Sequence, residues 1–236
     1  KSLINKIKTR NILTYSIKYK KADVLIFDII QNKLKTSFKL KINNKIIHSS
    51  NYKFTINAIG NHNILNATAS IVAAKLNGIK NKDINNALTN YVGVKRRFSF
   101  IGKKNKSFVY DDYAHHPTEI AATLSAAKSL KNKVIVVFQP HRYTRTKILI
   151  REFIKVLTKV DYLFLLETYS AGEKIIKGAT SKDIYSKILK KNKNTTYLKN
   201  IGDLNKLIKP HTMNKNTIIF MGAGSISSIA KKYLNN

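Results

Sequence analysis

Residues 107–138 read SFVYDDYAHHPTEIAATLSAAKSLKNKVIVVF, and this stretch decides the fold class. It opens with a short run of β-branched and aromatic residues, which is typical of a strand. The segment PTEIAATLSAAKSL follows with apolar residues at helical spacing, and its proline suits a first helical turn. A second apolar run, KVIVVF, completes a strand–helix–strand unit, which favours parallel pairing of the two strands.

The same alternation continues downstream. The later strand-like runs are DYLFLLE, TTYL and TIIFMG, and the later helix-like runs are TKILIREFIKVL, SKDIYSKILKK, DLNKLI and SISSIAKKYL. Short apolar strands alternating with amphipathic helices predict an α/β fold with a doubly wound, Rossmann-like sheet. Such sheets bind ligands at the carboxyl ends of their strands. We therefore expect four polar clusters to meet on one rim: DDYAHHP, QPHRYTR, ETYSAGE and GAGS.

The upstream part of the chain is richer in strands. Five short runs in residues 12–57 predict a meander of strands: NILTYSI, ADVLIFDII, TSFKLKI, KIIH and YKFTI. At His62 the pattern changes to HNILNATASIVAAKLNGI, which predicts a helix with Gly78 as its C-cap, and NKDINNALTNY predicts a second helix. A hairpin is expected around residues 103–106. We place a domain boundary near Val92, so that residues 1–92 and 93–236 form separate domains.

The composition is that of a globular protein. A chain of 236 residues with 43% hydrophobic residues can bury a proper core. No apolar run approaches the roughly 20 residues that span a bilayer, and KSLINKIKTR lacks the apolar centre of a signal peptide, which favours a soluble cytoplasmic protein. The absence of cysteine excludes disulfides and thiolate metal sites. Because the first segment shows no obvious start of a fold, we expect a fragment.

The formal net charge is +32, from 44 Lys and Arg against 12 Asp and Glu. Such a charge usually suggests a polyanionic partner. Here Lys, Asn and Ile are abundant along the whole chain, as a nucleotide bias toward A and T would produce, and basic residues do not alternate with aromatic ones in the way that stacks bases. We therefore expect no specific nucleic-acid partner.

Arginine is rare in this lysine-rich chain. The six arginines are Arg10, Arg96, Arg97, Arg142, Arg145 and Arg151. A guanidinium grips a carboxylate or phosphate with two parallel donors, whereas an ammonium is a point charge, so clustered arginines predict an anion site. A solvated surface position explains Arg10 and Arg151 more simply. The pair in FQPHRYTRT, Arg142 and Arg145, is the strongest candidate.

The segment DDYAHHPTE brings two carboxylates, a phenol and two imidazoles together. The adjacent Asp111 and Asp112 repel each other unless a cation or ligand hydroxyls compensate. A metal site on D-x-x-H-H is conceivable, but a zinc site needs three or four convergent ligands, and we expect none. The simpler alternative is an aspartate that caps the next helix and a histidine satisfied in the core.

Two further motifs, GAGS and the helix start at His62, indicate a function less specifically. GAGS predicts a tight strand-to-helix turn, with Gly222 and Gly224 allowing positive φ, in preference to a dinucleotide site. No G-x-x-x-x-G-K-[ST] occurs, so this chain lacks the main phosphate cradle of a nucleoside triphosphatase.

His62 and Asn66 share one helix face, where an amide can pair with a purine edge. Helix capping by the asparagines on either side of His62 is the alternative.

Six motifs together resemble the Mur ligase family: GNHNILNA, GVKRRF, DDYAHHPTEIAATL, VVFQPHRYTRT, YSAGE and MGAGSI. DDYAHHPTE and FQPHRYTRT are specific, GNHNILNA is shared widely within the family, and GAGSI is generic. Family proteins have a UDP-sugar domain, a central ATPase domain with a P-loop, and a Rossmann-like domain that binds the amino acid. The resemblance implies that residues 1–92 are the C-terminal part of the central ATP-binding domain and that residues 93–236 are the amino-acid-binding domain.

The resemblance also implies an activity in peptidoglycan precursor synthesis. ATP phosphorylates the lactyl carboxylate of UDP-N-acetylmuramate, the amine of L-alanine attacks the acyl phosphate, and the tetrahedral intermediate collapses to an amide, with Mg²⁺ bridging phosphates. The implied nucleotide contacts are His62, Asn66, Arg97 and Asp112, with the first two against adenine and the last near the ribose. The implied catalytic residues around alanine are Tyr113, His115, Arg142 and Arg145. The two arginines would hold the alanine carboxylate.

Other readings stay open at this point. Ser225 stands in GAGSI where alanine-adding members commonly have Asp. The family's tripeptide-recycling ligase shares the DD-aromatic-AHHP motif but lacks PHRYTR, which makes PHRYTR the discriminator for free alanine. A non-catalytic basic module that binds polyanions is the alternative from another class. Without a P-loop or sugar-nucleotide domain, the fragment alone is expected to be inactive.

Overall fold

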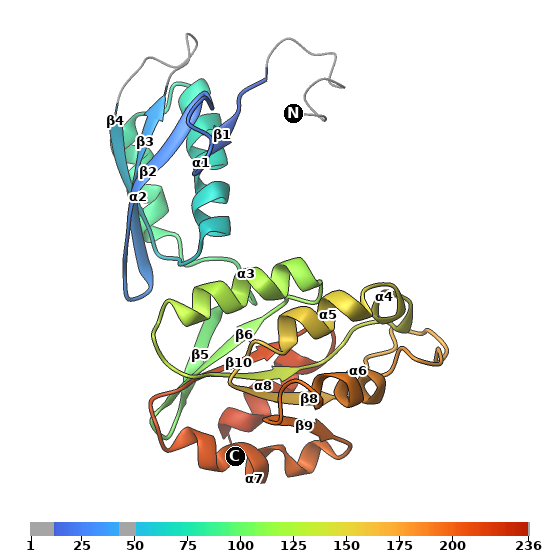
Figure 1. Cartoon of the computed structure of the whole chain (residues 1–236). Helices are drawn as coiled ribbons and strands as arrows, with labels where there is room; N and C mark the ends of the chain where they lie inside the picture. The colour runs from blue at the N-terminus through green and yellow to red at the C-terminus, as the bar shows by residue number, and fades with distance from the viewer. Residues whose placement is uncertain (1–11, 43–50, 236) are drawn as a thin grey trace. The chain divides into compact units, whose positions relative to one another are not determined.

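The computed structural model describes residues 12–42 and 51–235, and the chain divides into two compact units, Lys1–Val92 and Gly93–Asn236 (Figure 1). The described residues of each unit surround a hydrophobic core of their own. No helix among these residues is long and apolar enough to cross a membrane.

The first unit contains a four-stranded sheet. Its strands, in sheet order, are β1 Tyr15–Ser16, β2 Val24–Asn32, β3 Lys35–Ile42 and β4 Asn51–Ile56. Strands β2 to β4 form an antiparallel meander, as predicted, whereas β1 pairs with β2 in parallel, so the expected meander is wrong for the first strand. The hydroxyl of Ser16 accepts hydrogen bonds from the N–H groups of Lys18 and Tyr19, which turns the chain directly after β1. The predicted KIIH strand lies outside the described residues.

Two helices, α1 Asn61–Leu76 and α2 Asn81–Asn90, follow the sheet. The N-cap of α1 is Gly60, without a side-chain capping bond, so capping by the asparagines beside His62 is not observed. At the other end Gly78 has φ 77°, its N–H donates to the Lys75 carbonyl, and Ile79 N–H donates to the Ala74 carbonyl. This is the glycine-dependent helix ending that the sequence predicts. The buried core of this unit includes Phe38, Phe54, Ile64 and Ile71.

The second unit is built on a six-stranded sheet of order β5-β6-β10-β7-β8-β9. Its strands are β5 Ser99–Lys104, β6 Ser107–Asp112, β7 Val134–Phe138, β8 Tyr162–Leu166, β9 Thr195–Leu198 and β10 Thr217–Met221. Strands β6 to β10 are parallel, and β5 is an antiparallel edge strand that forms the predicted hairpin with β6. The parallel strands confirm the predicted α/β class.

Helices cover both faces of this sheet (Figure 1). Residues of α3, α5 and α6 pack on one face and those of α7 and α8 on the other. The helices are α3 Pro117–Lys128, α4 Tyr143–Ile148, α5 Ile150–Leu157, α6 Ser181–Ile188, the short 3₁₀ helix η2 Ile201–Asp203, α7 Leu204–Thr212 and α8 Ile226–Asn235. The predicted helix over TKILIREFIKVL is two helices, because the backbone of Leu149, with φ −106° and ψ 19°, interrupts it. The first of them begins at Tyr143, inside FQPHRYTRT.

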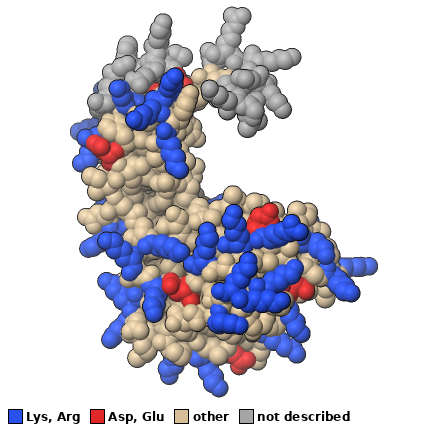
Figure 2. Space-filling model, in the orientation of Figure 1, with Lys and Arg blue, Asp and Glu red and all other residues tan. Residues whose placement is uncertain are grey.

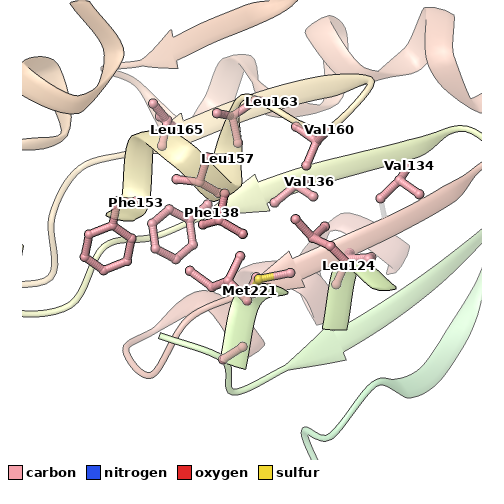
Figure 3. Packing of buried hydrophobic residues seen from close by; sticks show 14 of the residues in the cluster. Leu124, Val134, Val136, Phe138, Phe153, Leu157, Val160, Leu163, Leu165 and Met221 are labelled. Atoms are coloured by element: carbon pink, nitrogen blue, oxygen red, sulfur yellow. The ribbon is translucent and has the colours of Figure 1, made fainter. Parts of the chain in front are cut away.

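Buried aliphatic and aromatic side chains fill the space between the sheet and helices α3, α5 and α6 (Figure 3). The rings of Phe138 on β7 and Phe153 on α5 are fully buried, with centroids 5.7 Å apart. Burying one such side chain contributes roughly 1.5–3 kcal/mol. This core holds the strands rigidly, so the loops at their carboxyl ends start from fixed positions.

Candidate functional site

The carboxyl ends of β6, β10, β7 and β8 lie next to one another in the sheet. We call the end of β6 and the segments that follow the four strands the rim: residues 111–117, 139–145, 167–173 and 222–225. Hydrogen bonds join these segments, since Gly222 N–H donates to the Asp112 carbonyl (3.0 Å) and Tyr169 N–H donates to the Pro140 carbonyl (2.9 Å). The four clusters therefore meet on one rim, as predicted.

A row of aromatic rings runs along the rim. Tyr113 and His115 form an edge contact with centroids 5.1 Å apart, and His115 lies 5.9 Å from His141. The His141 ring stacks on Tyr169 at 5.4 Å and 13°. The row therefore connects the ends of β6, β7 and β8, and it brings two imidazoles together.

The two imidazoles differ in which ring nitrogen accepts a proton. His115 Nδ1 lies 2.9 Å from the Tyr113 carbonyl, which only accepts, so Nδ1 donates and Nε2 of the neutral ring is an acceptor. His141 Nδ1 lies 3.2 Å from Arg145 Nη1, which only donates, so the His141 proton is on Nε2. Burial, followed by the charges of Arg145, His115 and Arg142, lowers the pKa of His141. The rim thus presents one acceptor and one donor from neighbouring rings.

The two arginines of FQPHRYTRT contact different partners. Arg142 Nε donates to Glu173 Oε1 at 2.7 Å. Arg145, one turn later, donates through Nη1 to the ring and carbonyl of His141. Within the described ranges no carboxylate lies at ion-pair distance from Arg145. Arg142 is therefore neutralised by a carboxylate of the protein itself, whereas Arg145 has no such partner among the described residues and could pair with an external anion.

Glu173 is held by more than its ion pair with Arg142. The N–H of Thr144 donates to Glu173 Oε2 (3.0 Å), and the Thr144 hydroxyl donates to Oε1 (2.6 Å). The Thr144 hydroxyl and N–H bonds, and then Arg142, lower the pKa of Glu173 to about 2. This carboxylate therefore stays ionised at any physiological pH.

Asp112 is buried and directed into the protein. Its Oδ2 accepts the N–H of Phe98 (2.8 Å), and its Oδ1 accepts the N–H of Ala114 (2.7 Å). Burial outweighs these bonds and raises the pKa of Asp112. The side chain thus ties the segment before β5 to the end of β6, and both of its oxygens are engaged within the protein.

Asp111 belongs to a separate network. Its Oδ2 accepts the Ser227 hydroxyl at 2.6 Å and lies 3.5 Å from Arg96 Nε. Arg96 also donates through Nη2 to the Gly222 carbonyl (2.6 Å), and its guanidinium lies 4.8 Å from the Tyr113 ring centroid. The adjacent aspartates therefore have different partners inside the protein. No group of three His, Cys, Asp or Glu side chains in the described residues could hold a metal.

Arg97 lies beside Tyr113 on the rim. Its guanidinium carbon is 5.8 Å from the Tyr113 ring centroid, and Nη1 is 3.8 Å from Glu119 Oε1. About half of the Arg97 side chain is exposed. Its charged group is therefore available to an anion that reaches this edge of the rim.

Helix α3 begins two residues after His115 in the sequence. His116 is its N-cap, Pro117 is the first helical residue, and Glu119 completes a capping box by accepting the N–H groups of His115 (3.1 Å) and His116 (3.2 Å). Burial acts to raise the pKa of Glu119, but these bonds and the neighbouring cations lower it overall. The alternative of an aspartate cap is thus wrong, because both aspartates remain on β6 and a histidine takes that position.

The GAGS turn passes close to the rest of the rim. A Cβ on Gly222, whose φ is 150°, would lie 2.7 Å from the Gln139 carbonyl oxygen. A Cβ on Gly224 would lie 2.6 Å from Tyr169 Cγ, although Gly224 does not have the predicted positive φ. Close approach to Tyr169 is therefore the reason for glycine at 224. Ser225 exchanges hydrogen bonds with the Gln139 amide.

His62 and Asn66 lie on α1 in the first unit, one helical turn apart. His62 is half-buried and Asn66 is exposed. The structure therefore places both on one helix face, as the spacing predicts, but in a different unit from the other predicted site residues.

Four residues of the site were not predicted individually from the sequence: Arg96, His141, Tyr169 and Glu173. His141 belongs to the PHRYTR motif, and Tyr169 and Glu173 belong to YSAGE. Their contacts connect segments about 30 residues apart, and no periodicity in the sequence encodes such a pairing. The rarity of arginine was a usable signal for Arg96.

Comparison with known proteins identifies the family of this chain. Residues 96–224 match the domain described as "Mur ligase, glutamate ligase domain". The chain belongs to the Mur ligase family. It is 38% identical over 240 aligned residues to the UDP-N-acetylmuramate–L-alanine ligase of Rickettsia typhi, covering 98% of this chain and 48% of that protein. The chain thus spans about half the length of the curated relatives it matches.

Solved structures of family members share the fold. The UDP-N-acetylmuramate–alanine ligase of Thermotoga maritima superposes with a TM-score of 0.76 and 26% identity, covering 94% of this chain and 47% of the other. A murein peptide ligase of Psychrobacter arcticus has a TM-score of 0.63 and 24% identity, covering 94% and 45%. At that identity the second likeness concerns the fold alone.

Proposed function

We propose that this chain supplies the amino-acid-binding part, and the end of the ATP-binding part, of a cytoplasmic ligase that joins L-alanine to UDP-N-acetylmuramate in an ATP-dependent amide synthesis. The observation that carries the proposal is Arg145. Its guanidinium lies 3.2 Å from the His141 ring, which neighbours the His115 ring on the rim, and it has no carboxylate partner in the described part of the chain. A small amino acid offers the carboxylate that this group lacks.

The groups of the rim suit both the carboxylate and the amine of an amino acid. Arg145 would hold the alanine carboxylate, and the Nε2–H of the neighbouring His141 offers a further donor. The amine must lose a proton before it attacks an acyl phosphate, and Nε2 of His115 is a suitable acceptor. Tyr113 packs edge-on against His115 and limits the movement of that ring. Holding the amine at a fixed angle is a large part of catalysis in such a reaction.

The residues that we propose for nucleotide binding are found in each of the two units. In residues 1–92, the ring of His62 and the amide of Asn66 offer hydrogen-bonding groups suited to adenine. In residues 93–236, the half-exposed Arg97 suits a nucleotide phosphate. Asp112, which the resemblance places near the ribose, has both oxygens bonded to backbone N–H groups, so we assign it the indirect role of fixing the backbone after Arg97. The chemistry of these donor groups fits ATP.

Magnesium is part of the proposal as a companion of ATP. The described residues provide no cluster of carboxylates or imidazoles for it, so its ligands here would be mainly ATP phosphate oxygens. When bound, Mg²⁺ neutralises phosphate charge. The cationic rim groups, by contrast, are suited to anions.

The test is an assay of the full-length gene product with UDP-N-acetylmuramate, ATP and Mg²⁺, in which the amine donor is varied. We expect phosphate release and amide formation with L-alanine, and little with the tripeptide L-alanyl-γ-D-glutamyl-diaminopimelate. Preference for the tripeptide would assign the recycling reaction instead, and no amine-dependent turnover would contradict the proposal. Residues 1–236 alone are expected to give no product, because the sequence contains no P-loop.

A further inference from the structure

The loop between β8 and α6, residues 167–180, is attached to the start of α4 at several points. Tyr169 pairs with both Pro140 and Arg142 through backbone hydrogen bonds of 2.9 Å. Lys147 Nζ donates to the Lys177 carbonyl at 2.9 Å. Between these points the Glu173 carboxylate binds Arg142 and Thr144, as described above. The loop is therefore fastened along its length, and Glu173 supplies its ionic contact.

Arg142 has an unusual backbone conformation for this role. Its φ is 72° and its ψ is 132°, a strained combination that non-glycine residues rarely adopt. Such a conformation persists only where the surroundings determine it. The N–H bond to Tyr169 and the side-chain bond to Glu173 are the contacts that do so. Arg142 is thus shaped to bind the loop.

We propose that Glu173 is a positioning residue that neutralises Arg142 and fastens loop 167–180 to α4, so that Arg145 holds the amino-acid carboxylate. The inference rests on the proposed function and divides the two arginines of FQPHRYTRT between two tasks. Glu173 acts through Tyr169: while the loop is fastened, the Tyr169 ring stays stacked on His141 at 5.4 Å. The stacked ring, in turn, keeps His141 against Arg145.

The first experiment measures the loop itself in residues 1–236. We compare the rates of hydrogen–deuterium exchange of amides 169–180 in the variants Glu173→Ala and Arg142→Ala and in the double variant. The control variant is Glu152→Ala, because Glu152 is an exposed residue on α5. Loss of a charge-assisted bond should speed exchange about 10-fold or more in each single variant, with no further increase in the double variant. The control should match the wild type. Unchanged exchange in Glu173→Ala, or effects that add in the double variant, would overturn the proposal.

The second experiment measures kinetics in the full-length gene product. We expect Glu173→Ala and Arg142→Ala to raise KM for L-alanine by about 10-fold each and non-additively, with kcat at saturating alanine and KM for ATP within about 2-fold. Arg145→Lys should reduce kcat/KM for alanine by roughly 10- to 150-fold. A larger loss in Arg142→Ala than in Glu173→Ala, additive in the double variant, would show that Arg142 binds alanine directly. Absence of any alanine-dependent turnover in the wild type would contradict the proposed function, and the exchange experiment would still decide the role of Glu173.

Discussion

Glu173 differs from an ordinary surface glutamate because Thr144 and Arg142 together donate three hydrogen bonds to its carboxylate. Its pKa is lowered from 4.5 to about 2. A carboxylate with a lowered pKa stabilises the folded state above its unfolded value, and this contribution is lost as pH falls through the folded value. We predict that the loop stays fastened at pH 4 and is released as pH approaches 2. Because Arg142 remains charged over this range, the carboxylate is the group that changes.

The measurement is an NMR titration of the Glu173 side-chain carboxyl carbon in residues 1–236. A midpoint near 2 would agree with the prediction, and a midpoint near 4.5 would contradict it. Glu152 provides the internal comparison because it is exposed on α5.

Asp112 offers a second test at this scale, because each of its two oxygens accepts a backbone N–H. Asp112→Asn keeps the size but replaces one acceptor oxygen with an amide donor, so one buried N–H loses its partner. We predict a destabilisation of the second unit by about 1–3 kcal/mol. Urea denaturation of residues 1–236 measures it, with Asp203→Asn, at an exposed position, as the control. A variant as stable as the control would show that these bonds contribute little.

Among the elements, the GAGS turn between β10 and α8 is constrained most directly by a neighbouring loop, because Gly224 lies against Tyr169 of loop 167–180. A methyl group at position 224 would lie 2.6 Å from Tyr169 Cγ and 2.8 Å from Gln139 Oε1. Both contacts are far shorter than van der Waals distance, so a neighbouring group must move, and we expect a displacement of Tyr169 that disturbs its stacking on His141. We predict that Gly224→Ala destabilises the second unit by roughly 1–3 kcal/mol and removes the ring-current shift of the His141 ring protons.

Thermal unfolding and ¹H NMR of residues 1–236 check both effects. Gly202→Ala, on η2, is the matched control, since its Cβ would lie 3.3 Å from the flexible Asn200 side chain and its φ is not positive. An unshifted His141 spectrum in Gly224→Ala would mean that the turn yields instead of Tyr169.

The sequence predicted most elements because their signals are local. Apolar runs marked the strands of the second unit, and helical spacing marked α1, α3 and α8. Two features were not predicted, for physical reasons. The parallel pairing of β1 depends on partners across the sheet, and α4 begins inside FQPHRYTRT because the positive φ of Arg142 ends the preceding loop there.

For the site, the residue types and the common rim were predictable, whereas the pairings were not. The order of elements places strand ends together whatever the loops contain. The choice of Glu173 over an external carboxylate as the partner of Arg142 depends on the path of a loop, which the sequence does not reveal. The sequence therefore predicted an anion site with two arginines, and the structure distinguishes their surroundings.

For the whole molecule, the charge of +32 remains the most conspicuous property. Figure 2 shows Lys and Arg side chains over much of the visible face of each unit, with few acidic side chains between them. A diffuse charge of this kind attracts DNA without recognising its sequence. We predict weak binding to duplex DNA at low salt that fades by physiological ionic strength.

Fluorescence anisotropy with two unrelated duplexes at several salt concentrations tests this prediction. Equal affinities that fall together with salt are the expected result. Selective binding of one duplex at about 0.15 M salt would contradict it and would favour a nucleic-acid function.

The order of strands in the second unit has a consequence for how the protein is made. Strand β10 lies between β6 and β7, although both precede it far back in the chain. On the ribosome, the hairpin of β5 and β6 and the three strands β7 to β9 are synthesised before the strand that joins them. Until residues 217–221 emerge, a nascent chain exposes two unpaired, apolar strand edges, which favour aggregation. Translation that stalls shortly before β10 would therefore leave a polypeptide in need of a chaperone or a protease.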